Sequence, residues 1–213
     1  MRLAGGGTVF GMLIQRSAGL LPLALLALAS SAGASPASCV PAGSRTLSAS
    51  GPARIYERGS TLYGCLGARR TSLGPLRGSA PLAARRVVLY ALSPGYAGTD
   101  TIDMGVDTLA STLGLVSLRT GATIASAPAT TPERAAESFS TATKLVVSAD
   151  GTLAWIGRRS AIGALTPVYE VHSLSGARGD RLLQSSTLEP RSLTIRGNTL
   201  TWSTGSHRSS TIV

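Results

Sequence analysis

The chain has few aromatic and few acidic residues, and both shortages exclude functions. Two Trp, five Tyr and two Phe make up 4% of the 213 residues, which does not provide the stacking platform of a single-stranded nucleic-acid binder. Charged residues account for 14% of the chain, compared with about 25% in an average soluble domain. Only ten residues are acidic, so the chain is not a disordered acidic protein.

Motifs of catalysis and metal binding are absent as well. The chain contains no GxSxG elbow, no HExxH and no CxxC sequence. Its two histidines, His172 and His207, are interpreted as surface residues of a strand and of a turn. Asp100, Asp103 and Asp107 form the one acidic cluster, interpreted as a solvated loop because the spacing is not that of an EF-hand. The sequence therefore predicts no catalytic residue, no metal site and no cofactor.

Only one long apolar run occurs, and it lies within residues 1–34. Arg2 and Arg16 precede this run, which covers residues 18–29, and the small residues Ala32-Gly33-Ala34 follow it. This order is typical of a secretory signal peptide, and the run is shorter than the roughly 20 residues that span a bilayer. Cleavage after Ala34 would leave residues 35–213, a single exported domain of 179 residues with net charge +8 and no transmembrane segment.

Arginine supplies nearly all of the positive charge, with 19 residues against the single lysine, Lys144. This bias is typical of GC-rich codon usage. The Arg pairs at residues 69–70, 85–86 and 158–159 are dispersed and have no interleaved aromatics, so we predict no nucleic-acid partner. A positive exterior still favours long-range attraction to anionic polymers. The partner classes left open are an anionic cell-wall polymer and another protein.

The two cysteines, Cys39 and Cys65, both follow the predicted cleavage site. In an exported chain, a pair 26 residues apart predicts one disulfide, worth about 3 kcal/mol on the chain-entropy description. It would tie the start of the domain to the first strand hairpin. The alternative is a lipoprotein anchored through Cys39, since small residues precede it, although Pro36 stands where a lipobox usually has Leu.

Hydroxyl-bearing residues, 28 Ser and 22 Thr, supply most of the polarity, and Thr favours strands. Short alternating segments predict a first group of strands at residues 46–50, 54–57, 61–66 and 69–73. Thr131-Pro132 is typical of a helix start, so a short helix is expected at residues 134–139.

Turn signals recur along the chain. Gly-Ala turns occur at Gly67, Gly121 and Gly176, with spacings of 54 and 55. Periods near 50 residues built from four short strands are typical of propeller blades. In this scheme the second repeat carries an insertion at residues 96–107.

One segment also resembles a known repeat. Val147-Ser148-Ala149-Asp150-Gly151-Thr152-Leu153-Ala154-Trp155 resembles the Ser-Pro-Asp-Gly-Lys-x-Ile-Ala motif of TolB-type and WD40-like propeller repeats, with Ala149 in place of Pro, and residues 192–202 echo it. The whole pattern is similar to secreted proteins of unknown function from GC-rich actinobacteria. We predict an all-β, β-propeller-like array of about three full blades and one incomplete blade. A β-sandwich is the alternative.

Pairing across each hairpin assigns side chains to the two faces of a sheet. A two-residue turn at Asp150-Gly151 predicts two apolar faces, one of Val146, Ser148, Leu153 and Trp155, the other of Leu145, Val147, Ala154 and Ile156. A turn at Gly197-Asn198 predicts one core face, with Leu193, Ile195, Leu200 and Trp202, and one hydroxyl-rich face, with Ser192, Thr194, Arg196, Thr199 and Thr201. We expect the hydroxyl-rich face to end an open array.

Together these features predict an exported, non-enzymatic β-repeat protein that binds a partner or serves as a scaffold at the cell exterior. The competing prediction is a secreted hydrolase that acts on an extracellular or cell-wall polymer, in which His172 would be required for activity.

Overall fold

The computed structural model describes residues 39–76, 85–104, 109–132, 138–161 and 165–213. They belong to one compact unit, Ser35–Val213. The predicted signal peptide at residues 1–34 lies outside the described residues. Within the described ranges the fold is all-β, with fifteen strands and no helix. A helix long and apolar enough to cross a membrane is likewise not found in these ranges.

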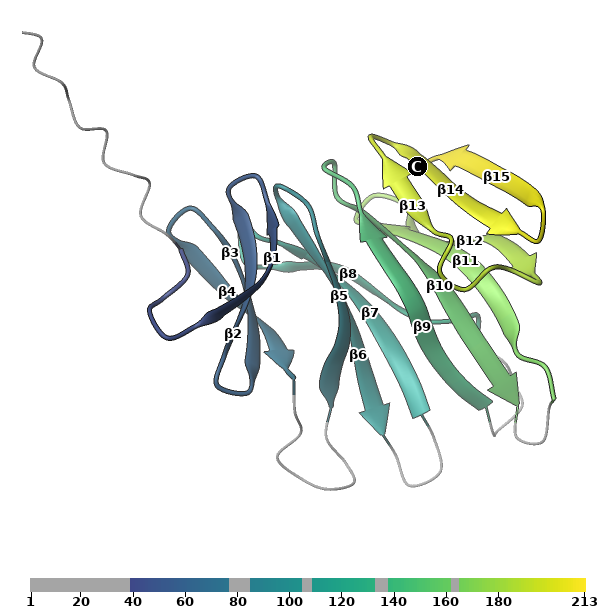
Figure 1. Cartoon of the computed structure of the whole chain (residues 1–213), viewed down its shortest axis with the longest axis horizontal. Helices are drawn as coiled ribbons and strands as arrows, with labels where there is room; N and C mark the ends of the chain where they lie inside the picture. Colours follow the sequence, from purple (N-terminus) through teal and green to yellow (C-terminus); the bar gives the residue numbers. More distant parts are fainter. Residues whose placement is uncertain (1–38, 77–84, 105–108, 133–137, 162–164) are drawn as a thin grey trace, which may run out of the picture. The chain divides into compact units, whose positions relative to one another are not determined.

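The strands follow one another as antiparallel meanders (Figure 1). The first meander comprises β1 (Arg45–Ser50), β2 (Ala53–Arg58), β3 (Thr61–Leu66) and β4 (Arg69–Pro75). The second comprises β5 (Arg86–Leu92), β6 (Tyr96–Met104), β7 (Leu109–Ser117) and β8 (Thr123–Pro128). The third comprises β9 (Ser138–Val147), β10 (Thr152–Ala161), β11 (Val168–Ser175) and β12 (Gly179–Ser186). The last sheet comprises β13 (Thr194–Arg196), β14 (Thr199–Thr204) and β15 (His207–Ile212).

Three four-stranded meanders and a three-stranded sheet match the predicted arrangement of three full blades and one incomplete blade. The three Gly-Ala turns each connect the third strand of a meander to the fourth, at β3–β4, β7–β8 and β11–β12. One parallel residue pair, Ala110 with Ser140, links β7 to β9. The second and third meanders therefore form a single eight-stranded sheet.

Two element predictions differ from the described strands. Residues 134–137 of the expected helix lie outside the described residues, whereas Ser138 and Phe139 belong to β9, where they pair with Ala161 and Ser160 of β10. Tertiary pairing with a ten-residue partner strand outweighs the local helix signal. The expected insertion at residues 96–107 begins with β6, which is a regular strand of the second meander.

The register of the β9–β10 hairpin also differs from its prediction. Leu153 pairs with Val147, and Trp155 pairs with Leu145, because the loop holds three residues instead of two. The Ser148 hydroxyl accepts a hydrogen bond from the Thr152 backbone N–H at 2.9 Å, and Gly151 takes a left-handed φ of 88°. Relative to β10, Leu145, Val146 and Val147 of β9 therefore lie on the faces opposite to those predicted. The expectation that both faces are covered is nevertheless confirmed.

Four apolar clusters are buried in the described fold. One face of β9–β10 packs with the second meander through Leu113, Leu115, Leu153 and Trp155. The other face packs with the last sheet through Ala154, Ile156, Leu200 and Trp202. A third cluster joins the first two meanders through Ile55, Leu62, Val116 and Leu118. The fourth is a small group of Cys39, Tyr56 and Cys65.

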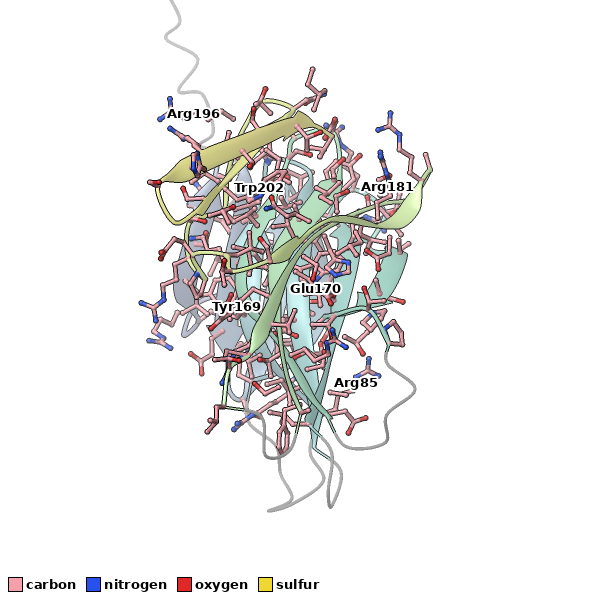
Figure 2. All side chains as sticks on the ribbon, turned by 90° about the vertical axis from the view of Figure 1, so that its right-hand side faces the viewer. Arg85, Tyr169, Glu170, Arg181, Arg196 and Trp202 are labelled. Carbon is pink, nitrogen blue, oxygen red and sulfur yellow. A yellow bond between two sulfur atoms is a disulfide. The ribbon has the colours of Figure 1, made fainter. Side chains whose placement is uncertain are left out.

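The faces of the last sheet are confirmed. Ile195 pairs with Leu200, and Thr194 pairs with Thr201. Leu193, Leu200 and Trp202 are buried, whereas Thr194 and Thr199 are exposed. Figure 2 shows Trp202 on the inner side of this sheet and Arg196 pointing away from it. The hydroxyl-rich face is therefore not covered by another described element.

Candidate functional site

Cys39 and Cys65 form the predicted disulfide, with their Cα atoms 5.9 Å apart. It attaches the first described residues to β3, as expected. Arg70 of β4 adds a second attachment, because its Nε donates to the Cys39 carbonyl at 2.9 Å. The stacked rings of Tyr56 and Tyr63 lie beside the disulfide. The bond is typical of a protein folded outside the reducing cytoplasm.

His172 is buried, so its interpretation as a surface residue was wrong. Its side chain is 1% exposed and stacks on Trp155, with ring centroids 5.1 Å apart. Its Nε2 lies 2.9 Å from Glu170 Oε2, and its Nδ1 lies 3.0 Å from Asp180 Oδ1. Since both ring nitrogens have carboxylate partners, His172 is not available as a general base for an external substrate.

The charges of this network stabilise one another. Burial alone would lower the pKa of His172, but its hydrogen bonds to Asp180 and Glu170 outweigh burial, and the net pKa is raised. Burial alone would raise the pKa of Glu170, but hydrogen bonds from the Thr131 backbone and His172 outweigh it, and the net pKa is lowered. Arg159 adds an ion pair to Glu170 at 3.5 Å. The arrangement is a buried ionic network with a structural role.

Two aspartates of the acidic cluster, Asp100 and Asp103, lie on one strand in different environments. Asp100 lies in β6 and is completely buried, so it was wrongly placed in a solvated loop. Asp103 is exposed on the same strand, and Asp107 lies outside the described residues. Over the part of the chain that is described, no group of three His, Cys, Asp or Glu side chains could hold a metal ion.

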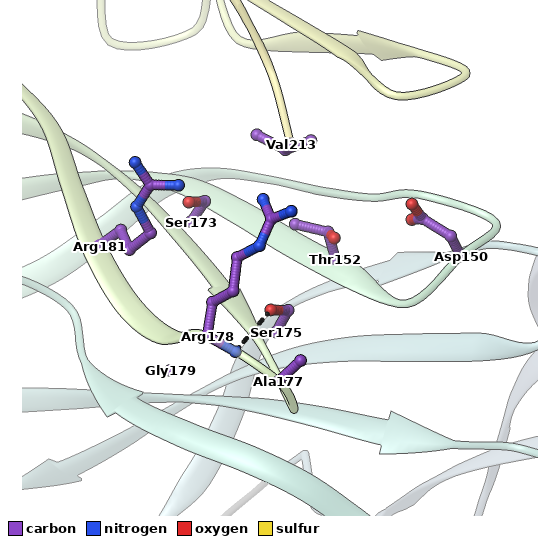
Figure 3. Close-up of a pocket in the computed structure, with 9 residues that line it drawn as sticks. All are labelled: Asp150, Thr152, Ser173, Ser175, Ala177, Arg178, Gly179, Arg181 and Val213. Atoms are coloured by element: carbon purple, nitrogen blue, oxygen red, sulfur yellow. Dashed lines mark hydrogen bonds between the residues drawn. The ribbon is translucent and has the colours of Figure 1, made fainter.

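A pocket lies where the third meander meets the last sheet (Figure 3). Its volume is about 190 Å³. Thr152 of β10 and Ser173 of β11 are buried in its floor, where the apolar cluster of this interface gives way to hydroxyl groups. Arg178 and Arg181 lie at its edge, on the β11–β12 turn and on β12. Val213 and Asp150 also line the pocket.

Strand pairing brings the two arginines to this pocket. Arg181 is the cross-strand neighbour of Ser173, and Gly179 is the neighbour of Ser175. The Ser175 hydroxyl accepts a hydrogen bond from the Arg178 backbone N–H at 3.2 Å, which fixes the turn. Figure 3 shows both guanidinium groups reaching into the space above Ser173 and Thr152. Residue alternation places the buried His172 network on the opposite face of β11.

The pocket has the chemistry of an anion site. Neither Arg178 nor Arg181 forms an ion pair with a carboxylate of the described residues. Asp150, the one acidic side chain at the rim, accepts a hydrogen bond from the Ser148 hydroxyl. Two planar guanidinium groups over a hydroxyl floor can bind the oxygens of a carboxylate or a phosphate.

No sequence signal assigns a role to Arg178 and Arg181, because they are not adjacent and belong to no motif. The one available signal is that both arginines closely follow the Gly176-Ala177 turn. Hairpin pairing across this turn would bring them to one end of the sheet. Glu170 and Asp180 were missed for a related reason, since their approach to His172 depends on the β11–β12 register and its irregularity at Val171 and His172.

Comparisons with known proteins leave the family open. No family model and no curated protein matches the chain. Among solved structures, the chain is similar to a GH74 xyloglucanase from Xanthomonas campestris, with 16% sequence identity and a TM-score of 0.42. The match covers 75% of this chain and 25% of that structure, so the chain spans a minor part of its length.

Proposed function

We propose that the protein is an extracytoplasmic binding protein that captures anionic groups of a cell-surface polymer at the pocket of Arg178 and Arg181. The observation that carries this proposal is the pair of guanidinium groups without carboxylate partners among the described residues, above the buried hydroxyls of Thr152 and Ser173. A charged pair of donors at a pocket offers more binding energy than dispersed surface arginines, because several charge-assisted hydrogen bonds form at once.

Two further observations support this proposal. The Cys39–Cys65 disulfide fits export, since such bonds persist in oxidising compartments. The formal net charge of +8 on residues 35–213 draws polyanions toward the protein over a distance set by the salt concentration. The general charge would set the rate of encounter, and the pocket would decide where an anionic group is held.

The test compares two double variants that remove the same charge. Arg178→Gln/Arg181→Gln changes the pocket, whereas Arg196→Gln/Arg208→Gln changes two exposed arginines of the last sheet. Binding to immobilised poly-L-glutamate, polyphosphate and neutral dextran is measured at two salt concentrations. We expect the pocket variant to lose about tenfold in affinity for one or both polyanions. Equal losses in the two variants would reduce the interaction to general charge and overturn the proposal.

A further inference from the structure

A second, larger hollow lies between the first two meanders, and no step of the proposed function uses it. This groove has a volume of about 450 Å³, within the range of small-molecule sites. Strand β4 forms one wall, and strands β6, β7 and β8 form the other. Half of its lining residues carry hydroxyl groups: Ser72, Thr99, Thr101, Thr112, Thr123 and Ser126.

The groove is hollow because the side chains along one sheet face change from apolar to small and polar. Ala97 of β6 and Val116 of β7 belong to the apolar cluster that joins the two meanders. Two residues further along each strand, the same face presents Thr99 and Gly114. A Cβ atom at Gly114 would lie 3.1 Å from the Thr99 hydroxyl, so the absence of a side chain there leaves room beside this hydroxyl.

The groove offers hydrogen bonds that the described part of the protein does not use. Thr101 and Thr112 are cross-strand neighbours, both half-buried, and their hydroxyls form no hydrogen bond with a described residue. Each hydroxyl can donate one hydrogen bond and accept others. Adjacent hydroxyls of this kind match a ligand that itself carries adjacent hydroxyl groups.

Charge narrows the ligand class. The lining contains no acidic side chain, so the groove does not favour a cation. Arg85 is exposed at the groove, and its guanidinium has no ion pair with a described carboxylate. We infer that the groove binds a sugar-sized polyol that bears one acidic group, with Thr101 and Thr112 contacting its hydroxyls and Arg85 contacting its carboxylate or phosphate.

The test uses three soluble probes and saturation-transfer NMR on the full chain. The probes are D-glucuronate, glucose 6-phosphate and glucose, which share a ring and differ in the acidic group. We expect saturable binding of at least one acidic sugar, and binding of glucose that is weaker by about tenfold. Preference between the two acidic sugars distinguishes a carboxylate ligand from a phosphate ligand. Absence of saturable binding by all three probes would overturn the inference.

Matched variants locate the binding. Thr101→Val/Thr112→Val removes two hydroxyls with little change of shape, and Thr194→Val/Thr201→Val does the same to a cross-strand Thr pair on the exposed face of the last sheet. We expect about tenfold weaker binding in the first variant only.

Arg85→Gln, at an exposed position, should reduce the affinity for the acidic sugars to the affinity measured for glucose. Equal losses in both Thr variants, or no loss in Arg85→Gln, would contradict the assignment. Arg178→Gln/Arg181→Gln should leave this binding unchanged, which separates the two proposals.

Discussion

Asp100 is the residue whose environment is least favourable to its charge. Its side chain is completely buried in β6, facing Leu113 of β7, and neither carboxylate oxygen has a hydrogen bond of good geometry. Burial raises the pKa of Asp100 to about 6, although the nearby Ser111 hydroxyl and Ala142 backbone partly oppose the rise. The folded protein therefore binds this proton more tightly than the unfolded chain does.

This raised pKa predicts a stability that falls with pH. The contribution of Asp100 to the free energy of unfolding decreases as pH rises from about 3.8 to about 6, and stays low above that. Asp100→Asn should therefore match the wild type at pH 4 and exceed it at pH 7.5 by up to about 3 kcal/mol. Urea unfolding at both pH values measures the difference. Asp103→Asn, an exposed position on the same strand, is the control. A variant less stable than wild type at pH 7.5 would contradict the prediction.

The charge of His172, unlike that of Asp100, is compensated by oppositely charged neighbours, Glu170 and Asp180. Since its pKa is raised, its ion pairs stabilise the fold below the ordinary value of 6.5 and are lost as pH rises through the folded value. His172→Phe retains a ring beside Trp155, but it removes the imidazolium partner of Asp180 and leaves Glu170 with Arg159 as its cation. We expect a loss of about 3 kcal/mol at pH 6 that narrows at higher pH, measured by denaturant unfolding. His207→Phe, at an exposed position, should have no such effect; a similar loss in both variants would refute the role assigned to His172.

At the scale of elements, residues 129–131, which follow β8, are hydrogen-bonded to side chains of β10 and β11. Trp155 Nε1 donates to the Ala129 carbonyl at 2.7 Å, and Glu170 accepts from the Thr131 backbone N–H at 2.7 Å. Gly157 permits this contact, because a Cβ atom there would lie 2.0 Å from the Ala129 oxygen. Residues 129–131, which follow β8, are therefore held by one glycine and two buried side chains.

Gly157→Ala should displace this segment and weaken both hydrogen bonds. We expect a loss of about 3 kcal/mol in the free energy of unfolding, together with a changed Trp155 fluorescence. Gly95→Ala is the control, since the atom nearest to its added Cβ would be Arg119 Nε at 3.5 Å, at the end of a flexible side chain. Wild-type stability in the Gly157 variant would show that the close approach of Gly157 to Ala129 does not contribute to stability.

Some elements follow from local sequence signals, and others depend on contacts between distant residues. The Gly-Ala turns and the alternation of β1 to β4 depend on local signals, and both were predicted correctly. The Asp150-Gly151 loop was predicted one residue too short, because its length depends on the Ser148 hydroxyl and the Thr152 backbone. The Arg178–Arg181 pocket could not be predicted, since it requires the last sheet to pack beside β12.

Across the whole described domain, each contact between successive meanders, and between the third meander and the last sheet, combines an apolar part with a polar one. The first and second meanders enclose a hydroxyl-lined groove beside their apolar cluster. The second and third enclose Asp100 and the His172 network beside theirs. The third and the last sheet enclose the two-arginine pocket. Hydroxyl-bearing and charged side chains thus leave a hollow at two of these three contacts without interrupting the strands.

Substitutions on the exposed hydroxyl-rich face of the last sheet test whether another sheet or a second copy packs against it. Thr194 and Thr199 are exposed, whereas Leu200 on the inner face is completely buried. Thr194→Lys/Thr199→Lys should therefore change the free energy of unfolding by no more than about 0.5 kcal/mol and leave the protein in its original state of association. Leu200→Ala on the same strand should lose about 2 to 5 kcal/mol. Denaturant unfolding and sedimentation measure both quantities. If the Thr face closed a ring or joined a second copy, two buried lysines would cost several kcal/mol, and the double Lys variant would unfold at a lower denaturant concentration or change its association.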